Sequence, residues 1–119
     1  MKVDVAVRQL EQALERLSWD AERQIDYTRR LGVGVDELAL EFDDSYRPVS
    51  RLIEEGLLPE ALSEAIKFID QSLEGMTRTP EDKWTEDAVR ASQEWLDMRK
   101  TARQAVSLLQ GIEFDTDDD

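Results

Sequence analysis

The sequence predicts an all-α protein, an irregular bundle of about four to five helices around a long N-terminal helix. Apolar residues of the N-terminal third recur at alternating steps of four and three, which is the spacing of one face of an α-helix. Residues that favour helices are abundant, whereas the chain has only five Gly and three Pro. Charged residues make up 36% of the chain, which is typical of helices with exposed outer faces.

The N-terminal helix is predicted to run from Val3 to Leu31 and to end at Gly32, a C-cap residue. Its apolar stripe follows the helical spacing and weakens after its sixth member: Val3, Val7, Leu10, Leu14, Leu17, Ala21, Gln24, Thr28 and Leu31. We expect a continuous helix, although Ser18 could mark a break. Other helices must cover this stripe, and a homodimer is possible if its seam pairs with a second copy.

Two short helices are expected next, near residues 36–44 and 45–55. Asp36 is a suitable N-cap for the first helix. An interior proline disrupts a helix, so two helices would place Pro48 in a first turn, where proline is tolerated. Residues 37–43 also alternate in polarity, which leaves a loop or a short strand open.

A further helix is predicted to begin with Pro59 at its first position and to end at Gly75. A polar linker follows over residues 76–83. The apolar positions of this predicted helix again keep helical spacing: Leu58, Leu62, Ala65, Ile66, Ile69, Leu73 and Met76.

The last helical region has two N-cap candidates, Thr85 and Ser92, of which Ser92 would begin a final helix over about residues 93–110. Gly111 would end that helix. Residues 1–112 are therefore predicted to form a single helical domain. Residues 113–119 are predicted to be a disordered acidic tail, because they are too charged to form a core.

The net charge of −13 is concentrated in two parts of the chain. Residues 32–82 hold four bases and thirteen acids, a net charge of −9, and residues 113–119 add five acids. Residues 1–31 are neutral. No basic stripe is present, so direct nucleic acid binding is disfavoured.

Two residue types are missing from the chain, and their absence limits the catalytic and metal-binding chemistry that it could perform. The chain has no Cys and no His, which excludes disulfides, thiolate chemistry and the commonest general base and metal ligand. No apolar run approaches the ~20 residues of a membrane span. We therefore expect a cytoplasmic protein that is not an enzyme, does not contact membranes and carries no cofactor.

The densest carboxylate group is Glu41, Asp43 and Asp44, with Glu54 and Glu55 following one element later. Grouped carboxylates can act in acid–base catalysis or hold a hard cation, so a metal-binding protein or carboxylate enzyme is one alternative. An inhibitor that mimics the charge of DNA is another. A solvated acidic surface is the interpretation that we favour for these residues.

Aromatic residues divide into two groups. Phe42, Phe68 and Trp95 keep helical spacing and are predicted to lie in the core. Trp19 and Tyr27 lie off the main stripe and are better candidates for contact with a partner.

Several segments look like those of a group of known proteins. They are DELALEFDDSY (36–46), LIEEGLL (52–58), WTEDAVR (84–90) and EWLDMR (94–99). With them the chain resembles small, acidic, all-helical bacterial proteins, some of which are similar to immunity proteins of toxin systems. The resemblance implies that the chain neutralises a toxin by binding it, and it transfers no site residues.

The leading hypothesis from the sequence is a non-catalytic protein-binding module, an immunity-type inhibitor that meets a basic partner with an acidic face. A toxin encoded nearby is a possible partner. The residues expected to bind that partner supply the charge and one aromatic anchor: Glu41, Asp43, Asp44, Tyr46, Glu54 and Glu55.

Overall fold

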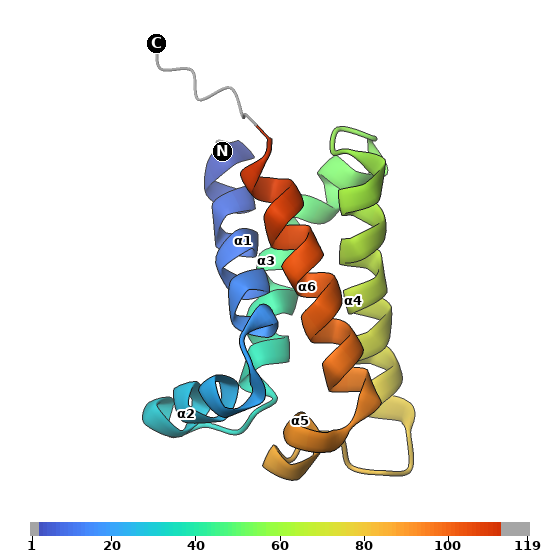
Figure 1. The fold of residues 1–119 in the computed structure, drawn as a ribbon. Helices are drawn as coiled ribbons and strands as arrows, with labels where there is room; N and C mark the ends of the chain where they lie inside the picture. Colours follow the sequence, from blue (N-terminus) through green and yellow to red (C-terminus); the bar gives the residue numbers. More distant parts are fainter. Residues whose placement is uncertain (1–2, 113–119) are drawn as a thin grey trace.

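The structure, a computed structural model, describes residues 3–112. This part of the chain contains six helices and no strand (Figure 1). In chain order they are α1 (Val3–Ser18), α2 (Ala21–Leu31), α3 (Glu37–Glu54), α4 (Glu60–Arg78), α5 (Glu86–Ala91) and α6 (Gln93–Gln110). The all-α prediction is confirmed, although about four to five helices were expected. The predicted tail at 113–119 lies outside the described residues.

The four long helices form an open ring. α1 packs against α3 and α6, and α6 packs against α1 and α4, whereas α3 and α4 contact each other little. Figure 1 shows α3 and α4 close together at the turn that joins them and apart at the other end. The short helices α2 and α5 contact each other there and lie across that end of the bundle.

The predicted continuous helix over residues 3–31 is wrong, because the chain breaks between Ser18 and Ala21. Asp20 is the N-cap of α2, and its side chain accepts a hydrogen bond from the amide of Arg23 at 2.9 Å. The buried side chain of Gln24 donates to the last carbonyls of α1. These hydrogen bonds satisfy backbone groups that the break exposes, and they therefore stabilise the change of direction between α1 and α2.

The predicted pair of helices at 36–44 and 45–55 is also wrong, since α3 is a single helix with Pro48 in its interior. An interior proline costs about 3 kcal/mol. Burial of one large apolar side chain is worth about 1.5–3 kcal/mol, and α3 buries four of them: Leu38, Phe42, Val49 and Ile53. Their combined burial outweighs the proline. Asp36 is at the N-cap position but makes no side-chain capping bond.

The boundaries of α4 differ from the prediction at both ends. Pro59 is the N-cap residue, so the helix begins at Glu60, and it continues through Gly75 to Arg78. A glycine inside a helix costs about 1 kcal/mol. The helix continues because Met76, which follows the glycine, is buried in the core.

The cap predictions in the C-terminal third are confirmed. The hydroxyl of Thr85 accepts a hydrogen bond from the amide of Ala88, and the hydroxyl of Ser92 accepts one from the amide of Trp95. Gly111 is the C-cap of α6. In the first third, Gly32 ends α2 as predicted, with a φ of 72° that favours glycine.

The core confirms two of the three aromatic predictions. Phe42 and Trp95 are completely buried, but Phe68 is 41% exposed, because it lies on the side of α4 next to a surface groove. Val7, Leu10, Leu14 and Leu17 of the apolar stripe are buried in α1, which packs against α3 and α6 of the same chain. That seam is therefore not available for pairing with a second copy.

Candidate acidic binding groove

The separation of α3 from α4 leaves a groove of about 650 Å³ on the surface. We call it the acidic groove. Its polar lining consists of four carboxylates and one hydroxyl: Asp36, Asp43, Asp70, Glu74 and Thr77. Its apolar lining comes from α3, α4 and the segment before α5: Ala39, Leu40, Phe42, Leu73 and Trp84. No Lys or Arg is among these residues, so the groove combines an apolar floor with negative charge.

Helical periodicity places the carboxylates. Asp36 and Asp43 are seven residues apart, and Asp70 and Glu74 are four apart, so each pair shares one face of its helix. Arg47 contacts Asp43 at 2.9 Å, and Arg78 contacts Glu74 at 2.8 Å. Both pairs are exposed, so their side chains can exchange partners at little cost.

Asp70 is a partly buried carboxylate of the groove with two other carboxylates nearby. Partial burial raises the pKa of its carboxyl above the ordinary value, and the negative charges of Asp43 and Glu74 raise it further. Within the described residues, no Lys or Arg lies at ion-pair distance from Asp70. A cationic group that entered the groove would relieve this repulsion.

Two large apolar side chains give the groove a contact surface for a partner. Leu40 is 53% exposed, whereas four other apolar residues of α3 are buried. Trp84 is partly buried and packs edge-to-face on the core residue Trp95, with 6.0 Å between ring centroids. Trp95 is held in turn by a 2.9 Å hydrogen bond from its indole nitrogen to the carbonyl of Lys83. Trp84 is therefore a pre-positioned wall of the groove.

The six residues expected from the sequence to bind a partner do not form one patch. Only Asp43 lines the groove. Glu41 is directed away from it, because its carboxylate accepts hydrogen bonds from Arg16 at 3.2 Å and from Tyr27 at 2.5 Å. Through these two hydrogen bonds, Glu41 joins α3 to α1 and α2.

The other expected residues are spread along α3. Tyr46 is partly buried and stacks on Phe42 beside the groove, with 5.5 Å between centroids. Asp44 is exposed. Glu54 and Glu55 are exposed at the C-terminal end of the helix, roughly 16 Å along the axis from Asp43 at 1.5 Å per residue.

The sequence interpretation missed most of the groove: Asp36 and Leu40 on α3, Asp70 and Glu74 on α4, and Trp84. Helical spacing was the available signal, because Asp36, Leu40 and Asp43 fall on one face at steps of four and three. What the spacing does not indicate is that this face lies opposite Asp70 and Glu74.

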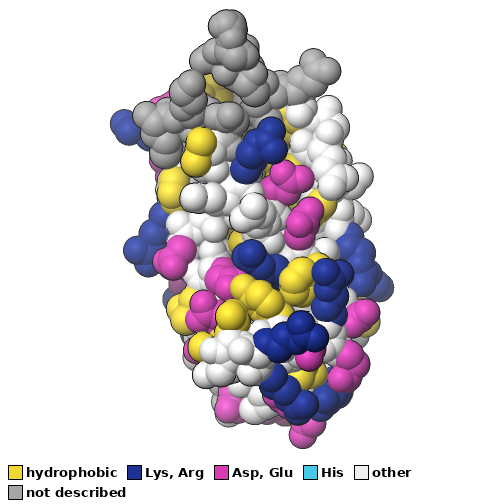
Figure 2. Space-filling model, turned by 90° about the vertical axis from the view of Figure 1, so that its left-hand side faces the viewer, with side chains coloured by type: hydrophobic (Ala, Val, Ile, Leu, Met, Phe, Trp, Pro, Cys, Tyr) yellow, Lys and Arg dark blue, Asp and Glu magenta, His cyan; other side chains and the backbone are white. Residues whose placement is uncertain are grey.

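The aromatic pair that was expected to contact a partner lies elsewhere, at the corner between α1 and α2. Trp19 and Tyr27 pack edge-to-face with 5.5 Å between centroids, and the guanidinium of Arg23 lies 4.0 Å from the Trp19 ring centroid. Figure 2, which looks onto the side of α1 and α2, shows Lys and Arg gathered in its lower half around apolar side chains. Positive charge is thus prominent on this side.

Two other features of the described residues bear on the site. Among the described side chains, no group of three carboxylates is arranged so that it could hold a metal ion. None of the helices in residues 3–112 has both the length and the apolar character that crossing a membrane requires.

The chain was compared with known proteins in three ways. It matches no protein-family model, no curated protein and no solved structure at a significant level.

Proposed function

We propose that this chain is a non-catalytic binding protein that receives a basic, partly apolar segment of a partner protein in the acidic groove. The observation that carries the proposal is the juxtaposition of Asp36 and Asp43 on α3 with Asp70 and Glu74 on α4 around an apolar floor. An opening of this kind suits an amphipathic segment that has Lys or Arg on its edges.

Electrostatics support this proposal in two ways. The segment 32–82, which contributes nearly all of the groove, carries a net charge of −9. Such a field accelerates encounter with a cationic surface, and salt weakens the effect. Burial raises the pKa of Asp70, and the nearby charges of Asp43 and Glu74 raise it further, so a cation beside Asp70 would be favoured.

The apolar residues support the proposal because charge alone rarely provides affinity. Leu40 and Trp84 offer a large aliphatic and a large aromatic surface in the same groove as the four carboxylates. Desolvation of such residues at the centre of an interface is the usual origin of slow dissociation.

The specific form of the proposal is an immunity-type inhibitor that occupies a basic toxin. This form depends on the resemblance of segments 36–46, 52–58, 84–90 and 94–99 to small acidic helical proteins of that kind. The product of a neighbouring gene is the first partner to test.

The experiment begins with capture of partners from the lysate of the source cell at low and high salt, followed by binding kinetics with the partner that is retained. Replacing Asp43 and Glu74 with Asn and Gln should slow association several-fold and reduce its dependence on salt. Leu40→Ala should leave association nearly unchanged and accelerate dissociation.

A matched control removes the same amount of charge outside the groove. Glu54→Gln combined with Glu55→Gln changes the net charge equally but leaves the groove intact. If this pair slows association as much as the groove pair, general acidity drives binding and the groove is not the site. Failure of Leu40→Ala to change dissociation would lead to the same conclusion.

A further inference from the structure

A second groove lies between α4 and α6, away from the acidic groove, and unlike that groove it has a cation, Arg103, in its lining. We call it the cationic groove. It has a volume of about 770 Å³ and an apolar floor that includes Ala61, Ala65, Phe68 and Leu108. Phe68 is 41% exposed and Leu108 is 36% exposed, so two large apolar side chains are left uncovered here.

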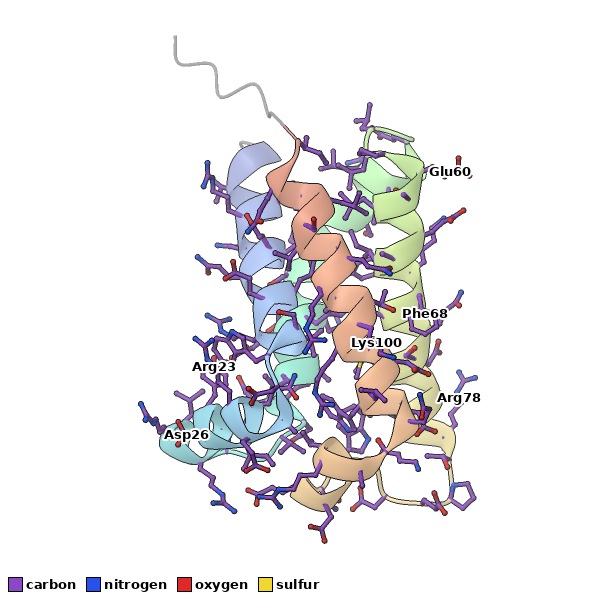
Figure 3. All side chains as sticks on the ribbon, in the orientation of Figure 1. Arg23, Asp26, Glu60, Phe68, Arg78 and Lys100 are labelled. Atoms are coloured by element: carbon purple, nitrogen blue, oxygen red, sulfur yellow. The ribbon has the colours of Figure 1, made fainter. Side chains whose placement is uncertain are left out.

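One cation lines this groove, and two more lie close in sequence to residues that line it. Arg103 lines the groove, whereas Lys67 is next to Phe68 in sequence and Lys100 is one turn before Arg103. Figure 3 shows Phe68 on α4 and Lys100 on α6 at about the same level of the two neighbouring helices. Glu64 is the only acid in the lining.

These three cations differ from most others in the described part of the chain. Arg16, Arg29, Arg30, Arg47, Arg51, Arg78, Lys83 and Arg90 all contact a carboxylate. Within the described residues, Lys67, Lys100 and Arg103 have no such partner at ion-pair distance. In a protein with 28 acids, a group of unpaired cations beside exposed apolar side chains indicates a surface suited to an acidic, partly apolar segment.

The sequence contains a segment with this composition. Residues 113–119 read Glu-Phe-Asp-Thr-Asp-Asp-Asp, which is one aromatic side chain among five acids. The segment begins five residues after Leu108, which is itself part of the groove. Seven residues can span up to roughly 24 Å, whereas Arg103 to Gln110 covers roughly 10 Å of helix, so the segment can reach the groove.

We propose that residues 113–119 bind back onto the cationic groove of the same chain, with Phe114 on Phe68 and Leu108 and the acidic side chains near Lys100 and Arg103. Phe114 is the only apolar residue of this segment, and docking would place it on an existing apolar surface. A covalent tether also raises the effective concentration of the segment at the groove. A docked tail would cover Phe68 and Leu108 and would leave the acidic groove open.

The absence of cysteine allows a direct test, because a single introduced cysteine carries the only spin label. The variant Asp118→Cys, labelled with a nitroxide, should broaden the backbone amide signals of Phe68, Arg103 and Leu108 at low salt. High salt should reverse much of the broadening, since the attraction of exposed charges is screened. Phe114→Ser, which leaves the charge unchanged, should abolish it.

A charge-matched pair of variants isolates the cations. Lys100→Glu with Arg103→Glu should remove the broadening, whereas Arg30→Glu with Arg47→Glu, an equal change of charge elsewhere, should not. Circular dichroism checks that each variant is folded. Broadening confined to the last turn of α6, or unaffected by Phe114→Ser, would overturn the proposal. So would broadening that appears only between labelled and isotope-enriched copies in a mixed sample.

Discussion

Arg99 of α6 donates from Nε to Oε1 of Gln24 in α2 over 3.1 Å, and both side chains are buried. Gln24 also donates to the carbonyls of Arg16 and Leu17 at the end of α1, and Arg99 donates to the carbonyl of Val89 in α5. Burial lowers the pKa of Arg99, yet an arginine remains charged in proteins. This pair therefore joins α1, α2, α5 and α6 at the end of the bundle that α2 and α5 cover.

The Gln24–Arg99 contact should be strongly coupled. Gln24→Leu removes the acceptor of the buried Arg99 Nε and the side-chain donor to the carbonyls of Arg16 and Leu17, so it should lower the free energy of unfolding by about 3 kcal/mol. Arg99→Met should also destabilise, and the double variant should lose at least about 1 kcal/mol less than the sum of the single losses. Urea denaturation of all four proteins measures this cycle. Additive losses would show that the two side chains act independently.

Pro48 should be a site where stability can be gained. The residue is exposed in the interior of α3 and has no amide hydrogen to donate to the preceding turn. Pro48→Ala should raise the free energy of unfolding by about 1–2 kcal/mol, because the helix gain of about 3 kcal/mol is partly offset by a more flexible unfolded chain. The measurement is the urea midpoint at an unchanged slope. A lower midpoint would show that proline is required in α3.

Asp70 should make stability depend on pH in the direction opposite to a carboxylate in an ion pair. Its pKa is raised in the folded protein, so the folded state loses stability as the pH rises from the ordinary value of 3.8 through the raised pKa. Asp70→Asn should therefore stabilise the protein at pH 7, by roughly 0.2–0.5 kcal/mol, the scale of a like-charge pair.

The test of Asp70 is unfolding by urea between pH 4 and pH 7. The gain from Asp70→Asn should shrink toward zero as the pH approaches 3.8. Asp44→Asn is the control, because Asp44 is an exposed carboxylate on α3 outside the groove. An equal gain from both variants would indicate general charge repulsion rather than the local field of the groove.

Two ion pairs between α2 and α5 should have the ordinary pH dependence. Arg29 contacts Glu86 at 2.5 Å, and Arg90 contacts Glu22 at 2.7 Å. The hydrogen bond from each arginine lowers the pKa of its carboxylate partner below 4.5. Their contribution is therefore present above pH 4.5 and is lost as the pH falls through the lowered values.

Hydrogen exchange can measure these exposed pairs where global unfolding would miss them. Glu22→Gln combined with Glu86→Gln should accelerate exchange of the α2 and α5 amides roughly two- to fivefold at pH 7 and low salt. The difference should largely disappear in high salt. Equal acceleration in α1 and α6 would mean that the whole fold had been destabilised instead.

The sequence by itself determined that this chain is all-α, where most of its helices lie and several of their ends. Helical spacing depends on the chain alone, and so do caps formed within one turn, as at Gly32, Thr85 and Ser92. The location of the negative charge in residues 32–82 was likewise visible from composition.

Only the tertiary structure decided the features in which one helix responds to another. The break after Ser18 depends on Gln24, which caps α1 while it receives Arg99 from a helix 75 residues away. Pro48 stays inside α3 because burial against other helices outweighs its cost. Helical spacing placed Asp43 and Asp70 each on a face, but the small contact between α3 and α4 is what makes those faces the two sides of one groove.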